Sequence, residues 1–530
     1  MASNSVSAAK APTLAEQQPL LGNQETDLTD TSSDENVEEQ HTSGTFVRNL
    51  GTSEAFAIVI SIVIGSGVFT SPGSIDTNVP SPGIALVVWL VGGVLAWTGA
   101  STLAELGTAI PGEGGVQPFL RHIFGDVFGF LAAWTWIVAV MPATLAILSI
   151  VFVEIIYSAA GVTGQETRIE HKLLSVFVLV LISLANSIST KATTRLNSFF
   201  VVTKFLTIAA VVLAASVVVL LHIISGGDPT PDPLDWWRRP WFGYRDSVNL
   251  DGSVTHWDEL SQWETLGHLS AALYAALWAY SGWDKAIYIS AELSKPAIQL
   301  PLALNTSIPT IILCFITANA AYYVLLPWKV VSTTDSVAVT AITNLLGPAF
   351  GVVAAILICL VVAGSLLGNS FVAGRMAVAA AHRNWFPSIF GLVGLIGYGR
   401  QTETPSNPES YANATNNKHT RSSDAPINAI ILSAVLSSLY ILLGNFRALL
   451  TFNGLGEYTF FFLTVVGAIV LRYREPALER PYKPSLVVPL VFSLVSGFVV
   501  LRGAIFAPIQ AVLLLGLWGL GCVFYVFGVL

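Results

Sequence analysis

Charged side chains are scarce in this sequence: they make up 11% of its 530 residues, whereas 53% of the residues are hydrophobic. A soluble globular protein carries about 25% charged residues. The mean hydropathy of +0.67 points in the same direction. This composition fits a chain whose surface faces lipid, so we expect an integral, multi-pass membrane protein.

Cysteine is also rare, and all three cysteines (Cys314, Cys359 and Cys522) lie within apolar runs rather than in loops. We therefore expect no structural disulfide. The eight histidines have no metal-ligand spacing, and the sequence has no G-x-x-x-x-G-K-[ST] motif to cradle phosphates. These absences argue against an ATP-driven pump and against an enzyme, and we expect no cofactor and no nucleic-acid partner.

Long apolar runs are abundant instead. A membrane-spanning helix needs about 20 predominantly apolar residues. Twelve runs meet this requirement: 52–73, 83–109, 127–159, 173–190, 197–224, 266–292, 304–326, 344–380, 427–444, 451–472, 485–502 and 504–528. We predict an all-α membrane protein with twelve transmembrane helices, here called spans 1 to 12. Its expected parts are a tail (1–50), a transporter core (51–505) and a last helix (504–530) with almost no C-terminal tail.

The first fifty residues differ from the rest. They hold eight acidic and two basic residues, which account for most of the net charge of −8. Their polar composition predicts a disordered tail. Within it, "EQQPLLG" (16–22) resembles a dileucine sorting signal, so Glu16, Leu20 and Leu21 form a candidate site for a sorting adaptor. The alternative is a plain tail, and the destination is accordingly the vacuolar or the plasma membrane.

The orientation in the membrane follows from the distribution of Lys and Arg, which favour cytoplasmic segments. With the N-terminus inside, the inside segments carry fifteen of these residues and the outside segments eight. Both termini are therefore expected in the cytosol. Residues 225–265 then form a long outside loop, and the sequon at Asn413 lies inside, where we expect no glycan.

Two of the apolar runs contain helix breakers. Gly65-Ser66-Gly67 interrupts "SIVIGSGVFTSPGSI" (61–75), and Ser281-Gly282 interrupts "ALYAALWAYSGWDKAIYISAEL" (272–293). A lone glycine in a membrane helix often serves only close packing. A pair of breaks five spans apart is instead typical of transporters, in which the free backbone groups of broken helices bind the substrate near the membrane midplane.

Four segments resemble the L-type amino-acid transporters of the amino acid–polyamine–organocation superfamily. They are "IGSGVFTSPGSI" (64–75), "ELGTAIPGEGGVQPFLRHIFGDVFGFLAAW" (105–134), "LWAYSGWDKAIYISAELSKPAIQLP" (277–301) and "LRYREPALERPYKPSLVVPL" (471–490). The resemblance covers about residues 50–505. Among fungal relatives, the chain looks like the methionine and general neutral amino-acid permeases.

This resemblance implies a five-plus-five inverted repeat (a LeuT-like fold) with discontinuous helices 1 and 6, followed by two further spans. It also implies a substrate site at the two breaks. The substrate carboxylate would meet the N–H groups of Ser66 and Gly67, and its ammonium would meet backbone carbonyls. The segments that would supply these groups are Val63, Ile64, Gly65, Ser66 and Gly67 on span 1, and Trp278, Ala279 and Ser281 on span 6.

The resemblance implies functions for three side chains. Trp278 occupies the position of an aromatic gate, although it could also be a packed aromatic. Ser281 stands where the family often has Gly, and both residues reduce the space for bulky aromatic substrates. Lys204, about seven residues into span 5, matches a lysine that takes the place of a sodium ion and bridges span 1 to span 8.

The charged residues inside spans leave alternatives open. Asp284 and Lys285 pair with each other as structure, or Asp284 faces the substrate and admits cations. Glu457 tunes selectivity or carries a proton, since burial favours the protonated carboxyl group; alternatively it is solvated or paired with Arg447. Ser365, together with Asn369 on span 8, is a weaker candidate for the substrate site.

The leading hypothesis is a sodium-independent permease for neutral L-amino acids such as methionine and leucine, driven by proton symport or by exchange. A cationic amino-acid or polyamine carrier is the second hypothesis, and a non-transporting amino-acid sensor is the third. Animal members of the family have a cysteine between spans 3 and 4 that links a heavy chain. The corresponding segment "SAAGVTGQETRIEH" (158–171) has none, so we expect no disulfide-linked partner.

Overall fold

The computed structural model describes residues 50–528, apart from 111, 113, 163–167, 189, 226–235, 250–252, 335, 394–424 and 445. The chain divides into two units, Met1–Ser43 and Gly44–Leu530, and all described residues belong to the second. The predicted tail with its dileucine sequence and the sequon at Asn413 lie outside the described residues. The predictions for these segments therefore stay predictions.

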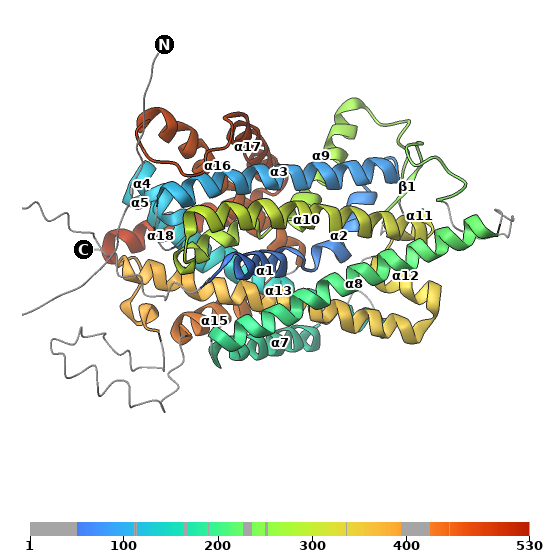
Figure 1. The fold of residues 1–530 in the computed structure, drawn as a ribbon, viewed down its shortest axis with the longest axis horizontal. Coiled ribbons are helices and arrows are strands. Elements are labelled where there is room, and N and C mark those ends of the chain that lie inside the picture. The colour runs from blue at the N-terminus through green and yellow to red at the C-terminus, as the bar shows by residue number, and fades with distance from the viewer. Residues whose placement is uncertain are drawn as a thin grey trace, which may run out of the picture. The chain divides into compact units, whose positions relative to one another are not determined.

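The described part of the chain is almost entirely helical (Figure 1). It contains a π-helical turn (η1), two 3₁₀ helices (η2 and η3) and one two-stranded hairpin among α-helices. In chain order the elements are α1 (Thr52–Val63), α2 (Gly67–Asp76), α3 (Pro82–Ala109), α4 (Val116–Phe124), α5 (Asp126–Thr135), η1 (Trp136–Val140), α6 (Met141–Ala159), α7 (Ile169–Ile188), α8 (Thr190–Ile224), β1 (Ser247–Val248), β2 (Val254–Thr255), α9 (Gln262–Ala279), η2 (Trp283–Glu292), α10 (Pro296–Leu325), α11 (Trp328–Ser332), α12 (Val337–Leu346), α13 (Pro348–His382), η3 (Ser388–Gly391), α15 (Ile427–Leu443), α16 (Phe446–Arg474), α17 (Val487–Phe506) and α18 (Pro508–Gly528).

Among these elements, nine helices are long and apolar enough to cross a membrane, and α1 with α2 forms a further candidate bent by 45°. The all-α membrane fold is thus confirmed. Each of the twelve predicted apolar runs overlaps a helix, but α15 has only 17 residues, and α9 with η2 is broken and carries buried charges. The count of twelve spans therefore stays a prediction, as does the inverted repeat.

Local sequence signals determine where several helices begin. Ser81 caps α3, because its hydroxyl accepts a hydrogen bond from the Ile84 N–H at 3.4 Å. Ser261 and Glu264 form a capping box at the start of α9: the hydroxyl accepts from the Glu264 N–H at 3.3 Å, and the carboxylate accepts from the Ser261 N–H at 2.9 Å.

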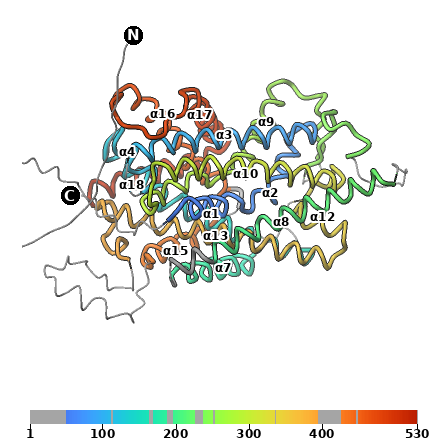
Figure 2. The backbone as a smooth tube through the Cα atoms, viewed as in Figure 1, coloured from blue at the N-terminus to red at the C-terminus, as the bar shows by residue number. Residues whose placement is uncertain are grey.

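The first broken helix, formed by α1 and α2, lies in the interior of the bundle. Helix α1 contacts α8, α10 and α13, and α2 contacts α9. Figure 1 shows α1 and α2 in the middle of the view, with α3 and α10 on one side and α8 and α13 on the other. In Figure 2 the tube passes from α1 into α2 through this central region.

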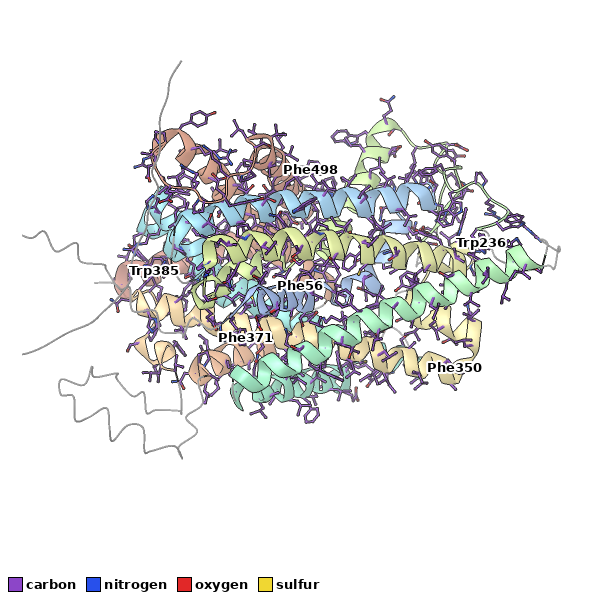
Figure 3. All side chains as sticks on the ribbon, viewed as in Figure 1. Phe56, Trp236, Phe350, Phe371, Trp385 and Phe498 are labelled. Carbon is purple, nitrogen blue, oxygen red and sulfur yellow. The ribbon has the colours of Figure 1, made fainter. Side chains whose placement is uncertain are left out.

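Exposed apolar side chains cover the outer helices, as lipid contact requires. Phe350 of α13 and Phe498 of α17 lie at the periphery, whereas Phe371 of α13 is buried (Figure 3). Trp236 and Trp385 lie at opposite ends of the bundle in the same view. We refer to these as the α2 end, where α2 finishes and the hairpin lies, and the α1 end, where α1 starts.

The segment that carries the hairpin is fastened to α2. Strand β1 pairs antiparallel with β2, with Ser247 opposite Thr255. Arg245, just before the hairpin, forms an ion pair with the buried Asp76 at the end of α2. Tyr323 of α10 also donates to Asp76, at 2.6 Å. The α2 half of the broken helix is therefore held both by a neighbouring helix and by the connecting loop.

Candidate functional site

A small cavity of about 50 Å³ lies between the two broken helices. Both breaks contribute to it, as do α6, α13 and α16. Its lining residues are Ile62, Val63, Gly65, Ser66, Gly67, Thr144, Ile147, Leu148, Trp278, Ala279, Ser281, Gly282, Lys285, Asn369 and Asn453. This volume holds a few water molecules, so a bound amino acid requires the cavity to widen.

The break in the first helix supplies hydrogen-bond donors. Helix α1 ends at Val63 and α2 begins at Gly67. Within the described part of the chain, the N–H groups of Ser66 and Gly67 donate to no acceptor. Together with the partial positive charge of a helix N-terminus, these groups suit a carboxylate.

The break in the second helix supplies acceptors. Helix α9 ends at Ala279, and the chain turns through Gly282, whose φ of +105° favours glycine. The carbonyl oxygen of Ala279 accepts no hydrogen bond from the described residues. The two breaks lie close together because Gly67 has no side chain: a Cβ added there would lie 2.6 Å from the Cα atom of Ala279.

The predicted backbone acceptors on the first helix are not equivalent. Val63 lines the cavity, and among the described residues its carbonyl accepts from the Gly65 N–H, at 2.8 Å. Ile64 does not line the cavity, and its carbonyl is bound by Lys204 and Ser365. Both carbonyls stay predicted partners of a substrate ammonium, and the structure engages the Ile64 carbonyl elsewhere.

Lys204 of α8 is fully buried behind the first break. Its ammonium donates to the carbonyl oxygens of Ser61 (2.6 Å), Val361 (2.9 Å) and Ile64, and to the hydroxyl of Ser365 (3.0 Å). It thus connects α1 to α13, in the arrangement that the family resemblance implies. Ser365 belongs to this cluster and does not line the cavity, and its role in substrate binding stays a prediction.

Trp278 borders two cavities. The second, which we call the vestibule, has a volume of about 570 Å³ and lies toward the α2 end. The elements that form it are α2, α6, α9 and α16, with Ser336 and Arg502 at its edge. Trp278 lines both the small cavity and the vestibule, and its role as a gate stays a prediction.

The charged residues near the second break form one buried cluster. The Lys285 ammonium donates to both carboxylate oxygens of Asp284 (3.0 and 2.8 Å) and to Glu457 (2.9 Å). Ser281 donates to the other oxygen of Glu457 at 3.0 Å. Lys285 and Ser281 line the cavity, whereas Asp284 and Glu457 do not.

This cluster bears on two of the open alternatives. Asp284 is paired with Lys285 and does not line the small cavity, so its role in substrate binding stays a prediction. Glu457 is 2% exposed and paired with Lys285, so it is neither solvated nor a lining residue. The side chain of Arg447, its expected partner in one interpretation, lies outside the described residues.

Sequence reasoning missed five lining residues, of which Ile62 lies in α1 just before the first break. Thr144, Ile147 and Leu148 come from α6 and Asn453 from α16. The Thr144 hydroxyl lies 3.2 Å from the side-chain oxygen of Asn453, so the two residues connect their helices. The spacing of Asn453 and Glu457 places them on one helix face, which is a signal that could have identified Asn453.

Buried ion pairs join the elements that meet at the α1 end of the bundle. Glu292, the last residue of η2, pairs with Arg375 of α13, and both are almost fully buried. The Leu50 N–H donates to the Glu292 carbonyl at 3.0 Å, so the start of α1 and the end of η2 meet there. Glu105 of α3 binds both Arg472 and Arg480.

Comparison with known proteins gives one family and several relatives. The model of a family described as amino acid permease matches residues 50–524. The chain is 28% identical over 461 residues to the b(0,+)-type amino acid transporter 1 of Homo sapiens, covering 87% of this chain and 83% of that protein. It is 27% identical to the Asc-type amino acid transporter 1 of Mus musculus (87% and 77% covered). It is also 26% identical to the large neutral amino acids transporter small subunit 2 of Mus musculus (86% and 76% covered).

Proposed function

This chain belongs to the amino acid permease family, and we propose that it transports neutral L-amino acids across a membrane. The similar proteins named above are amino acid transporters of the b(0,+), Asc and large-neutral types. Methionine and leucine are the substrates that we favour. The assignment to the fungal methionine branch stays a prediction.

The observation that carries this proposal is the pairing of donors and acceptors across the small cavity. The N–H groups of Ser66 and Gly67 suit a carboxylate, and the carbonyls of Val63 and Ala279 suit an ammonium. An amino acid carries both groups in one molecule, and it would be held by backbone atoms alone. Its side chain would then extend toward α6 and α16.

The wall of the cavity favours neutral over cationic side chains. The charged residue that lines it is Lys285, while both nearby carboxylates are engaged by Lys285. A cationic side chain would therefore meet an ammonium rather than a free carboxylate. A polyamine also has no carboxylate to occupy the donors of Ser66 and Gly67. These observations rank the cationic and polyamine hypotheses below the neutral one.

The proposed mechanism is alternating access. An amino acid enters from the vestibule, Trp278 closes over it, and the Glu292–Arg375 pair then separates to open the α1 end. In the orientation expected from the charge distribution, the vestibule faces outward and both termini are cytosolic. The ammonium of Lys204 occupies the position that a sodium ion would need, so transport is proposed to be sodium-independent.

The test is uptake into proteoliposomes that contain only the purified chain and are preloaded with unlabelled leucine. Labelled methionine, leucine, lysine and putrescine are compared, with sodium and with choline in its place. We expect saturable uptake of methionine and leucine that does not change without sodium, and uptake of lysine and putrescine at least about tenfold weaker, which corresponds to 1.4 kcal/mol. Preferred uptake of lysine or putrescine would support the cationic alternative, and binding without uptake would support a sensor.

A further inference from the structure

The buried cluster of Asp284, Lys285 and Glu457 is not neutral in its ordinary charge state. It contains two carboxylates and one ammonium, and each residue is at most 2% exposed. Charges inside a membrane protein are costly unless they are paired, and they usually mark function. Lys285 can balance only one of the two carboxylates, so one negative charge remains without a counter-ion inside the cluster.

Among the described residues around Glu457, no second cation compensates the remaining negative charge of the cluster. The ionisable side chains that interact with it are Lys285 and Asp284 from η2, Tyr274 from α9, Tyr288 from η2 and Tyr458 from α16. The three tyrosines are neutral hydroxyl groups. Arg502 of α17 lies beyond one of these tyrosines, with its guanidinium 5.8 Å from the centre of the Tyr274 ring.

The two carboxylates are not held equally. Asp284 accepts two hydrogen bonds from Lys285, its neighbour in the chain, and also accepts one from its own backbone N–H. Glu457 receives one bond from Lys285 and one from the Ser281 hydroxyl. Glu457 is therefore the carboxylate that can release Lys285 and bind a proton instead. Asp284 meanwhile holds Lys285 in place.

We propose that Glu457 is the proton-binding site through which this chain couples amino-acid uptake to a proton gradient; the proposal rests on the proposed transport function. Binding of one proton to a Glu457 oxygen makes the cluster neutral. A zwitterionic amino acid adds no net charge. Each transport cycle thus moves one substrate molecule and one net positive charge across the membrane.

The contacts of Glu457 explain how the two ligands would be coupled. Both side chains that donate to it, Ser281 and Lys285, also line the substrate cavity. A substrate that draws either donor toward itself weakens the hold on ionised Glu457 and favours its protonated form. By linkage, protonation strengthens substrate binding by the same factor.

The structure also offers an entry route for the proton. Tyr274 lines the vestibule beside Arg502, and it interacts electrostatically with both Arg502 and Glu457. Glycine at position 454 leaves room for the Tyr274 hydroxyl against α16. Under this proposal, a proton would pass from the vestibule to Glu457 beside Tyr274.

The test separates proton-driven accumulation from exchange in proteoliposomes. With an inward gradient of one pH unit, the membrane potential held at zero and no internal substrate, wild-type protein should accumulate methionine up to about tenfold, the limit for one proton per substrate under these conditions. Glu457→Gln should lose this accumulation while it still exchanges external for internal methionine. Glu457→Asp, which keeps a carboxylate, should restore accumulation at a lower rate. Glu475→Gln changes an exposed carboxylate just after α16 and serves as the matched control.

The outcomes distinguish this proposal from the proposed function. Wild-type protein that exchanges methionine but never accumulates it would overturn the proton site and leave the transport function intact. Wild-type protein that neither exchanges nor accumulates amino acids would overturn the transport function itself. Accumulation that survives in Glu457→Gln, or exchange that is lost in both Glu457→Gln and Glu457→Asp, would assign Glu457 a purely structural role.

Discussion

Lys204 and Ser365 bind the same carbonyl group of α1 from two different helices. The Lys204 ammonium donates to the Ser61 oxygen at 2.6 Å, and the Ser365 hydroxyl donates to the same oxygen at 2.8 Å. Both side chains also bind the Ile64 oxygen, at the last turn before the break. The end of α1 is thus fixed by a lysine from α8 and a serine from α13. These two side chains stabilise the backbone next to the break without lining the cavity.

Removal of the Lys204 ammonium should therefore disable transport. In Lys204→Met, the carbonyls of Ser61 and Ile64 keep the Ser365 hydroxyl as a side-chain donor, whereas the Val361 carbonyl loses its lysine donor. A buried polar group left unsatisfied costs about 1–3 kcal/mol. We expect uptake of methionine to fall at least about tenfold, which corresponds to 1.4 kcal/mol, with the amount of protein in the membrane determined in parallel. Lys172→Met is the control, because Lys172 also binds a helix-end carbonyl (Leu442, 2.8 Å) but lies in a more exposed position away from the break. Equal uptake by Lys204→Met and wild type would contradict this role.

The close approach of the two breaks predicts the effect of a single methyl group. In Gly67→Ala the new Cβ would lie 2.6 Å from the Ala279 Cα and 2.9 Å from its Cβ. Because both are atoms of a packed helix end, the two half-helices must move apart. We expect the affinity for methionine, measured by binding to purified protein, to fall by about tenfold or more, since overpacking typically costs 1–3 kcal/mol.

Gly516→Ala is the matched control for that experiment. Gly516 lies in the outer helix α18, and an added Cβ there has no atom within 4 Å. It should bind methionine as wild type does. Unchanged binding by Gly67→Ala would show that the two breaks do not need this contact.

The sequence was sufficient to locate both breaks, because glycine in an apolar run is a local signal. Gly65-Ser66-Gly67 and Ser281-Gly282 separate helices in the structure where the sequence predicted them. Lys204 was identified through the family resemblance. Its four oxygen partners come from residues at least 140 positions away in the chain, so they could not be derived from local patterns.

The partner of Glu457 was the main feature that the sequence could not supply. Lys285 is 172 positions away, and no periodicity links η2 to α16. The sequence suggested either a free carboxylate near the substrate or a pair with Arg447. The partner of Glu457 depends on how the second break packs against α16. This packing buries three charges together and places Lys285, rather than a carboxylate, at the cavity wall.

The position of Trp278 between the cavity and the vestibule predicts a change in substrate size. Trp278→Phe removes part of a ring that borders both spaces. We expect phenylalanine and tryptophan to inhibit methionine uptake several-fold better in this variant than in wild type, since an added buried methylene is worth about 0.8 kcal/mol. Competition assays with a series of unlabelled amino acids measure this shift.

The control for Trp278 is Trp263→Phe. Trp263 lies in the first turn of the same helix, is 78% exposed and does not line either space. This variant should keep the wild-type order of inhibitors. If both variants shift the order equally, or if neither does, Trp278 is not the residue that limits substrate size.

The buried pair of Glu292 and Arg375 predicts a shift between the two states of the transporter. In Arg375→Ala the Glu292 carboxylate loses its ion-pair partner while almost fully buried, and loss of one partner from a buried pair typically costs about 3–5 kcal/mol. The closed α1 end is therefore destabilised relative to a state in which it opens and hydrates Glu292. Opening at this end should close the vestibule.

A cysteine placed at Ser74, which lines the vestibule, reports this shift. We expect a membrane-impermeant thiol reagent to modify Ser74→Cys at least several-fold more slowly when Arg375→Ala is also present, because a preference of about 3 kcal/mol reverses a modest population bias. Lys295→Ala, an exposed cation just beyond η2, should leave the modification rate unchanged. A rate that rises in the Arg375→Ala background would mean that the pair holds the vestibule shut rather than the α1 end, and the assignment of the two gates would have to be exchanged.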